Sequence, residues 1–401
     1  MEKKQNVPAL RFQGFSGEWE KKTLGDFGNV AMNRRIFKEQ TSETGEIPFY
    51  KIGTFGKEPD AYISRQLFEE YKAKYPYPDV GDILLSAAGS IGKTVEYTGK
   101  DEYFQDSNIV WLKHDERLDN PFLKYFYSKV KWGTLEGGTV KRLYNKILLE
   151  TEIVLPEIIE QKKIGKFFAS YDRMIAHQEG KIRKLQQFRQ AMLTKLFPRE
   201  GAAEPALRFQ GFFGPWRHTQ ISDIADVIGG GTPDTQIEEY WNGDIDWYTP
   251  AEMEGKRYAN GSDRKITELG LAKSGARLLP AHRTVLFTSR AGIGKMAILG
   301  KDGATNQGFQ SLVLNDYCDP YFIYTLGPFI TKCAERIAAG STFLEISGKA
   351  LGALEIMIPT KAEQEKIAKF FEKLDDIISL QQEMLDKIQK LKAALLEKLF
   401  V

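Results

Sequence analysis

The chain has 401 residues, 42% of them hydrophobic and 27% charged, which suits two or three globular domains with their own cores. Its formal net charge of +2 at pH 7 identifies no partner. Two cysteines and four histidines without ligand spacing argue against a disulfide framework and a metal site. The sequence has no apolar signal segment and no apolar run of membrane length, so we expect a cytoplasmic protein without a membrane span.

The opening of the chain occurs twice. PALRFQGFSGEW at 8–19 returns as PALRFQGFFGPW at 205–216, an offset of 197 residues. A period of this length indicates two duplicated domains and not a solenoid of small units. We therefore predict a first domain at 1–156, a helix at 157–197, a linker at 198–204, a second domain at 205–359 and a final helix at 360–401.

The interior of each copy has short β-like runs broken by Gly, Pro, Asn and Asp. In both copies the order is a strand, a glycine turn, a second strand, a third strand, a helix, a small-residue turn and a segment that leads into the long helix. These interiors differ far more between the copies than the openings and helices do. The pattern predicts that both copies do the same mechanical job but recognise different things. The matched segments are 81–97 and 283–299, 106–113 and 308–315, 119–130 and 318–337, 136–140 and 339–343, and 150–156 and 353–359.

A long helical pattern closes each copy, at 160–197 and 363–400, and the two align without a gap at an offset of 203. Apolar residues at spacings of three and four form one stripe, which is typical of a coiled-coil seam. Each helix would be about 57 Å long. The predicted seam residues are Ile164, Phe168, Tyr171, Ile175, Gln178, Ile182, Leu185, Met192, Leu196, Ile367, Phe371, Leu374, Ile378, Gln381, Leu385, Ile388, Leu395 and Leu399.

The two helices differ in charge. The first has nine Lys/Arg and three Asp/Glu, and the second has seven and eight. This difference favours pairing between the two helices of one chain, although a core or dimer-interface role stays open. Gln178 and Gln381 are expected to set the register. Gly180, opposite Glu383, is a candidate bend.

The whole arrangement resembles the DNA-specificity subunit of type I restriction-modification enzymes. The resemblance rests on the duplicated EQxKIxKFF helix entry, the preceding Leu-Pro and Ile-Pro pairs, and the AGSIGK and RAGIGK turns. It implies an α+β fold with two target-recognition domains, each followed by a long helix, and an antiparallel pair of helices that acts as a spacer. It also implies double-stranded DNA, two modification (methyltransferase) subunits and restriction (translocase-nuclease) subunits as partners.

A DNA reader needs side chains that hydrogen-bond base edges and cations that hold phosphates. Loop-like contexts provide candidates of both kinds, although many could be ordinary surface residues. In the first domain they are Asn33, Arg34, Arg35, Lys51, Ser90, Lys93, Lys141 and Arg142. In the second they are Thr232, Arg257, Ser289, Arg290, Lys295, Asn306, Gln307, Gln310, Ser341 and Thr342.

AAGSIGKT at 87–94 is similar to a phosphate-binding loop, which would give a nucleotide-using enzyme. Three features argue against it: the first glycine is absent, Met296 replaces the metal-binding hydroxyl in the duplicate, and a β-like run follows. The sequence shows no methyltransferase or nuclease constellation either. We therefore expect no catalytic residues, no metal and no cofactor. The alternative to a DNA reader is a coiled-coil scaffold for protein contacts without specific DNA reading.

Overall fold

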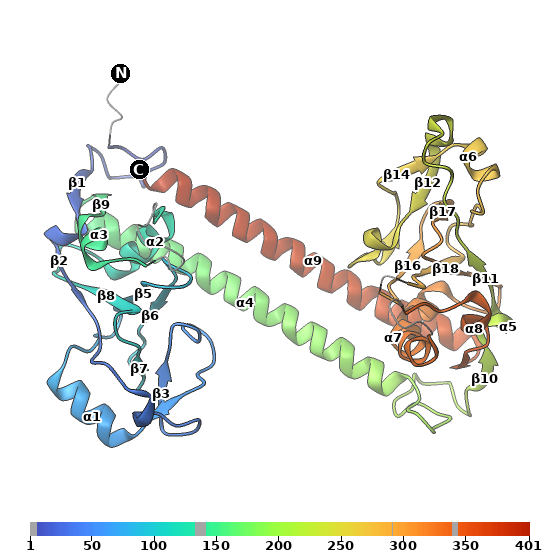
Figure 1. Cartoon of the computed structure of the whole chain (residues 1–401), viewed down its shortest axis with the longest axis horizontal. Coiled ribbons are helices and arrows are strands. Elements are labelled where there is room, and N and C mark those ends of the chain that lie inside the picture. The colour runs from blue at the N-terminus through green and yellow to red at the C-terminus, as the bar shows by residue number, and fades with distance from the viewer. Residues whose placement is uncertain (1–5, 133–141, 291, 339–343) are drawn as a thin grey trace. The chain divides into compact units, whose positions relative to one another are not determined.

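A computed structural model describes residues 6–132, 142–290, 292–338 and 344–401 of the chain. By its internal contacts it divides into unit 1, Met1–Gly180 with Glu383–Val401, and unit 2, Lys181–Gln382. Each unit combines a globular α+β domain with sections of both long helices (Figure 1). The turns predicted at 136–140 and 339–343 lie outside the described residues.

The domain of unit 1 is built on an antiparallel four-stranded sheet in the order β2-β8-β5-β6. A smaller sheet has the order β4-β3-β7, and β1 pairs with β9 beside the long helix. The strands are β1 Glu20–Thr23, β2 Gly28–Ala31, β3 Ile47–Tyr50, β4 Tyr62–Ile63, β5 Ile83–Ser86, β6 Thr94–Glu96, β7 Tyr103–Phe104, β8 Ile109–His114 and β9 Glu152–Leu155. The α-helices of the domain are α1 Arg65–Lys74, α2 Asn120–Lys129 and α3 Asn145–Glu150.

The domain of unit 2 repeats this plan with a larger sheet, β11-β18-β15-β16-β13, and a second sheet, β14-β12-β17. The strands are β10 Arg217–Gln220, β11 Ala225–Gly229, β12 Trp241–Tyr248, β13 Tyr258–Ala259, β14 Arg264–Ile266, β15 Thr284–Phe287, β16 Met296–Leu299, β17 Gly303–Thr305, β18 Gln310–Leu314 and β19 Glu355–Ile358. The helices are α5 Ile221–Ile224, α6 Glu268–Ala272, α7 Pro320–Ile337 and α8 Gly348–Gly352. Strand β10 pairs with β19, as β1 does with β9.

Local sequence explains the shared elements. Strands β5 and β15 are short apolar runs whose residues are all buried, as expected for strands covered on both faces. Helices α2 and α7 each begin after an aspartate whose carboxylate accepts a backbone hydrogen bond, from Phe122 and Phe322 respectively, and each has a proline in its first turn. The predicted strand–turn–strand segments, third strands and helices are confirmed, and the structure adds the strands β9 and β19 before the long helices.

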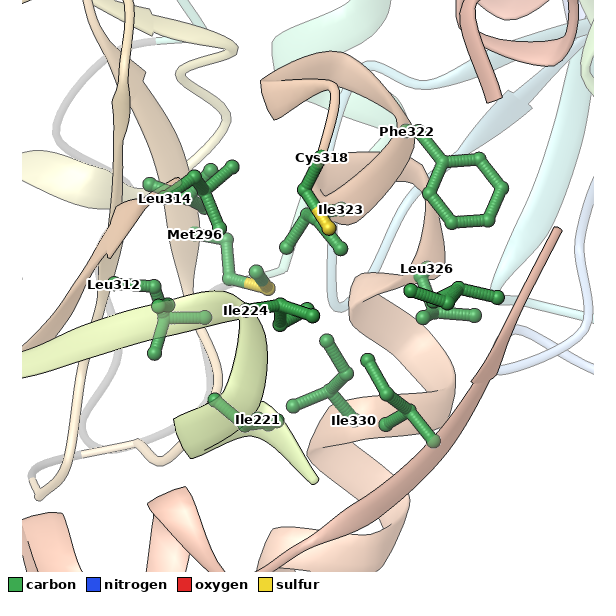
Figure 2. Close-up of a cluster of buried hydrophobic side chains, with 14 of the residues drawn as sticks. Ile221, Ile224, Met296, Leu312, Leu314, Cys318, Phe322, Ile323, Leu326 and Ile330 are labelled. Carbon is green, nitrogen blue, oxygen red and sulfur yellow. The ribbon is translucent and has the colours of Figure 1, made fainter. Parts of the chain in front are cut away.

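A single hydrophobic cluster joins the domain of unit 2 to the long helices. Figure 2 shows side chains of α5 and α7 meeting those of the sheet, with Met296 and Leu312 on one side and Phe322 and Ile330 on the other. The same cluster includes Phe371 of the long helix. The sheet, α7 and the helix therefore form one core in this unit.

The long helices are α4, Ile158–Leu196, and α9, Lys361–Leu399, close to the predicted bounds. Each starts with a buried glutamine that ties it to its domain. The Gln161 amide donates to Pro156 O at 2.9 Å and accepts from the Asp119 backbone N–H at 3.0 Å. Gln364 makes the equivalent bonds to Pro359 and Asp319. Helix α4 is continuous through Gly180, where an added Cβ would meet no atom within 4 Å.

The helices contact each other within each unit. All eighteen predicted seam residues are buried or half-buried. In unit 1 the rings of Phe168 and Phe400 lie 6.2 Å apart, and in unit 2 those of Phe197 and Phe371 lie 6.1 Å apart. In unit 1, Phe168 of α4 contacts Phe400, whereas Asp172, four residues later in α4, contacts Lys392, which is eight residues earlier than Phe400. The two helices are therefore locally antiparallel. Coiled-coil geometry itself stays a prediction.

None of the helices in the described ranges is long and apolar enough to cross a membrane.

Candidate nucleic-acid interface

In unit 1, three loops meet at one end of the central sheet. Strand β2 pairs antiparallel with β8, and β8 with β5, so the C-terminal ends of β2 and β5 lie beside the N-terminal end of β8. The segments 32–37, 87–93 and 105–108 leave the sheet at this end. We call them the sheet-end loops of unit 1. They bring together predicted contact residues that are distant in sequence: Asn33, Arg34, Arg35, Ser90 and Lys93.

Loop 32–37 presents two arginines with different surroundings. The guanidinium of Arg34 lies 5.2 Å from the ring centre of Tyr75. The Nε of Arg35 donates to Asp106 Oδ2 at 3.0 Å, and 60% of the Arg35 side chain is exposed. These residues line a cavity of about 460 Å³ together with the buried Asn33. The Oδ1 of Asn33 is buried and has no hydrogen-bond partner among the described residues.

The other predicted residues of unit 1 surround the same loops. Lys93 Nζ donates to the carbonyl of Phe55, which packs loop 51–56 against the turn 87–93. Lys51 begins this loop and pairs with Asp60 at 2.9 Å. Arg142 Nη2 donates to Ser107 O at 2.9 Å. Ser90 is exposed at the tip of its turn, and Lys141 lies outside the described residues.

Unit 2 has equivalent loops at the equivalent end of its sheet. The C-terminal ends of β11 and β15 lie beside the N-terminal end of β18, which places 230–234, 288–295 and 305–309 together. We call these the sheet-end loops of unit 2. The Thr232 hydroxyl donates to Gln307 Oε1, and both residues are exposed. A Cβ on Gly230 would lie 2.0 Å from Asn306 O, so the GGGT sequence is needed for this close approach.

The remaining candidates of unit 2 are less accessible. Arg290, Gln310 and Lys295 are half-buried, and Ser289 is fully buried, so its hydroxyl does not reach the surface in this structure. Lys295 hydrogen-bonds Glu254 and thereby lowers the pKa of that carboxyl. Asn306 Oδ1 accepts from the Gly308 backbone N–H at 2.8 Å. Ser341 and Thr342 lie outside the described residues.

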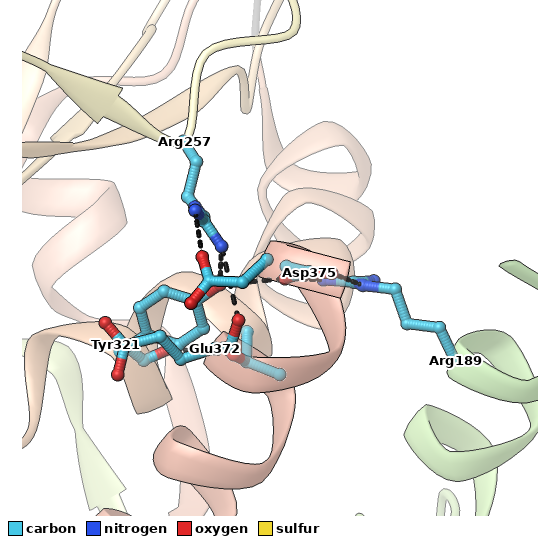
Figure 3. Close-up of polar contacts among 7 residues, drawn as sticks. Arg189, Arg257, Tyr321, Glu372 and Asp375 are labelled. Atoms are coloured by element: carbon cyan, nitrogen blue, oxygen red, sulfur yellow. Dashed lines mark hydrogen bonds and ion pairs between the residues drawn. The ribbon is translucent and has the colours of Figure 1, made fainter. Parts of the chain in front are cut away.

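Arg257 is the one candidate within the described residues that has partners on the long helix α9. It hydrogen-bonds the Tyr321 hydroxyl and the Glu372 backbone carbonyl, each at 3.3 Å (Figure 3). It also forms an ion pair with Asp376. Burial opposes the charged form, but these hydrogen bonds raise the pKa of Arg257 above its ordinary value. Its contacts give it a structural role at the base of the domain, away from the sheet-end loops.

The phosphate-loop alternative is disfavoured by the local structure. Residues 87–93 connect β5 to β6, so a strand and not a helix follows the glycine turn. A phosphate-binding loop needs the N-terminus of a helix at this point. The equivalent turn of unit 2 also leads into a strand, β16. Within the described ranges, no three His, Cys, Asp or Glu side chains are grouped to hold a metal ion.

The sequence prediction missed several residues at these ends because it considered cations, amides and hydroxyls but not carboxylates or aromatic rings. Asp106 holds Arg35, and Ser107 has a left-handed backbone, with φ of 59°. In unit 2, Arg264 stacks 3.7 Å from the ring centre of Trp241. The polar run Asp-Ser-Asn at 106–108, which lies just before a strand, was the available signal for a tight turn.

Comparisons with known proteins agree with this architecture. The family model described as the type I restriction modification DNA specificity domain matches residues 16–187 and 214–390. The chain is 55% identical over 152 residues to a putative type I restriction enzyme specificity subunit of Haemophilus influenzae, covering 38% of this chain and 40% of that protein. It is 36% identical over 192 residues to the type I restriction enzyme MjaIX specificity subunit of Methanocaldococcus jannaschii, covering 46% and 44%.

Each of these two curated matches therefore spans less than half of the relative's length. A crystal structure of the type I restriction-modification system S subunit from M. genitalium has the same fold over nearly the full length. It superposes with a TM-score of 0.66 at 16% identity and covers 98% of this chain and 99% of that one. Since the family model matches both copies of the repeat, the chain belongs to the type I restriction modification DNA specificity family.

Proposed function

We propose that the chain is the non-catalytic DNA-recognition subunit of a type I restriction-modification system. Its two domains, at 1–156 and 205–359, each read one half of an asymmetric bipartite sequence in double-stranded DNA. The helices at 157–197 and 360–401 keep the two readers at a fixed spacing. Reading both halves raises affinity because binding of the first domain increases the effective concentration of the second.

One observation carries this proposal: equivalent sheet-end loops carry different base-reading chemistry in the two units. Unit 1 presents Arg34 and Arg35, and unit 2 presents Thr232 and Gln307. Arginine suits guanine, and an amide suits adenine. Two readers with different side chains at the same place in the fold are what an asymmetric sequence requires.

The partners follow from the repeated parts of the molecule. The openings and helix starts make the same contacts in both units, which supports two equivalent docking surfaces and hence two modification subunits. Restriction subunits would join the same assembly. Because its proposed ligand is cellular DNA, we place the protein in the cytoplasm.

The test is a map of methylated bases in the source genome with this gene intact and deleted. We expect one two-part motif to lose its methylation on deletion. A genome whose methylation is unchanged, in a cell that produces the intact chain, would contradict the proposal. A scaffold without DNA reading would also differ in solution, because phosphate contacts make affinity fall steeply with salt.

A further inference from the structure

The sheet-end loops assign individual base-reading roles. We propose that Arg35, positioned by Asp106, reads a guanine in one half-site, and that Gln307, positioned by Thr232, reads an adenine in the other. This inference rests on the proposed function, which it deepens. It concerns which side chains determine the sequence, and which base each one requires.

The two pairs occupy equivalent places in the fold. Gly28 starts the pairing of β2 with His114, and Ala225 starts that of β11 with Leu314. Arg35 lies seven residues after Gly28, and Thr232 lies seven residues after Ala225, so the two residues occupy equivalent positions in the two copies. The partners come from the loop before β8 and the loop before β18, where Gln307 lies one position beyond the equivalent of Asp106. In both units, therefore, one residue of the first loop is joined to one residue of the third.

The geometry of Arg35 leaves its reading edge free. Asp106 accepts from Nε at 3.0 Å, so the two terminal amino groups keep their donors. No carboxylate among the described residues pairs with these terminal groups. A fork of two parallel donors matches the O6 and N7 acceptors of guanine in the major groove. The carboxylate also offsets the arginine charge, which favours a base edge over a phosphate as the partner.

The platform under Arg35 is itself held in place. The side chain of Asp106 is 14% exposed, and the Ser107 hydroxyl donates to the same Oδ2 at 3.1 Å. Ser107 adopts φ of 59°, and Arg142 binds its carbonyl at 2.9 Å. A left-handed serine is uncommon and persists where the surroundings enforce it. The loop thus fixes a carboxylate, and the carboxylate fixes the arginine.

Gln307 is arranged for the complementary pattern. Its Oε1 accepts from the Thr232 hydroxyl, which fixes the orientation of the amide. The oxygen keeps a second lone pair, and both N–H donors remain available, since the described residues supply no acceptor for them. An amide in this state can accept from adenine N6 and donate to N7. Thr232 is therefore a positioning residue, as Asp106 is.

The test uses the full chain, produced with its modification subunits in a host cell whose methylated motif is mapped. Arg35→Lys keeps the charge but loses the fork, so one G·C position of one half-site should become degenerate. Thr232→Val removes the hydroxyl at nearly constant shape, so one A·T position of the other half-site should become degenerate, whereas Thr232→Ser should not change the motif. Discrimination at each position should fall by about 5- to 150-fold.

Arg65→Lys is the matched control. Arg65 also pairs with an aspartate, Asp101 at 3.0 Å, but it stands on α1 outside the sheet-end loops. Its motif should equal that of the wild type. An unchanged motif for Arg35→Lys, or degeneracy at a position that is not G·C, would overturn the assignment of Arg35. An unchanged motif for Thr232→Val, or degeneracy at a position that is not A·T, would overturn the assignment of Gln307.

A variant that abolishes methylation altogether is resolved in solution. The purified Arg35→Lys complex is tested on duplexes with guanine or 7-deazaguanine, which lacks the N7 acceptor. Equal affinities would support the proposal, and a preserved preference for guanine would overturn it. If the wild-type chain directs no methylation at all, the proposed function fails, and that result is distinct from a failure of the base assignments.

Discussion

Each domain has two contrasting regions: the end that packs against the long helices, which we call the domain base, and the sheet-end loops. At the base, the copies make the same contacts: Arg11 binds Glu160 as Arg208 binds Glu363, both with two hydrogen bonds of 2.7–2.8 Å. The Tyr125 hydroxyl donates to Asp172 at 2.7 Å, and the Tyr321 hydroxyl to Asp375 at 2.8 Å. At the sheet-end loops, by contrast, an ion pair in one copy corresponds to a hydroxyl–amide pair in the other.

This difference follows from burial. The glutamates at the base are almost fully inaccessible, at 2% and 1% of their side-chain surface. A buried charge without its partner is costly, so neither member of such a pair can change alone. The Arg35–Asp106 pair, whose arginine is 60% exposed, contributes at most about 1 kcal/mol, so its residues are free to differ between the copies. The two copies therefore share the contacts that join domain and helix, and they differ at the sheet-end loops, where we propose that DNA is read.

The largest loss of stability at the domain base should come from removing an aromatic ring that packs between the long helix and the domain. Phe168 and Phe371 occupy equivalent positions and are each 0% exposed. Replacing either by alanine should cost about 3–5 kcal/mol through lost burial and a residual cavity. Hydrogen exchange should show the loss in unit 1 for Phe168→Ala and in unit 2 for Phe371→Ala. Phe213→Ala, at an 88% exposed ring, is the control and should change stability by at most about 0.5 kcal/mol.

The next largest effect should come from Arg208. Arg208→Ala leaves the buried Glu363 carboxylate without its cation and should cost unit 2 about 3 kcal/mol. Arg35→Ala removes the ion pair with Asp106 at the sheet-end loops and should cost less than about 1 kcal/mol, because the arginine is 60% exposed. Urea unfolding of the two variants compares the regions directly. Equal losses would contradict the contrast between base and sheet-end loops.

A smaller effect should distinguish unit 2 from unit 1 by the pH dependence of its folding stability. Cys318 replaces Leu118 at the start of the α7 helix, and burial raises the pKa of its thiol from 9.0 to about 11, although Lys361 and Arg217 act in the opposite direction. The unfolded thiol ionises first as the pH rises. The stability that Cys318 contributes is therefore complete below pH 9 and is lost between pH 9 and 11, by about 2–3 kcal/mol.

The measurement is the urea midpoint of unit 2 across this range in the wild type and in Cys318→Ala. The variant should lack this part of the pH dependence, although the small cavity it leaves lowers its stability at pH 7. Parallel curves for the two proteins would show that the thiol does not titrate in this range.

The sequence predicted the elements of the base because its signals are local and repeated. Apolar spacing of three and four located both long helices, and the predicted helices at 119–130 and 318–337 correspond to α2 and α7. Gly180 was a less certain signal: its helix cost is small, and α4 continues through it. Strands of only two residues, such as β4 and β13, left too short a pattern to find.

The sheet-end loops were predicted in composition but not in geometry. Residue type identified Arg35 and Gln307 as possible readers, yet their partners depend on the pairing of β2 with β8 and of β11 with β18. Strand pairing between distant segments cannot be read from a single sequence at this level. The same limit explains Arg257, whose loop context gave no sign of its contacts with the long helix.

The last prediction distinguishes Arg34 from its neighbour. Arg34 is exposed over Tyr75 and has no carboxylate partner among the described residues, so its full charge is available to a phosphate. Arg34→Gln should leave the recognised bases and the folding stability nearly unchanged, within about 0.5 kcal/mol. It should reduce the slope of log affinity against log salt by about 0.9, the contribution of one phosphate contact. Binding of the assembled complex to its own duplex at several salt concentrations gives this slope. If Arg34→Gln changed the base preference and left the salt slope unchanged, the roles of Arg34 and Arg35 would be exchanged. The side chain that reads the base would then be the arginine without a carboxylate partner among the described residues.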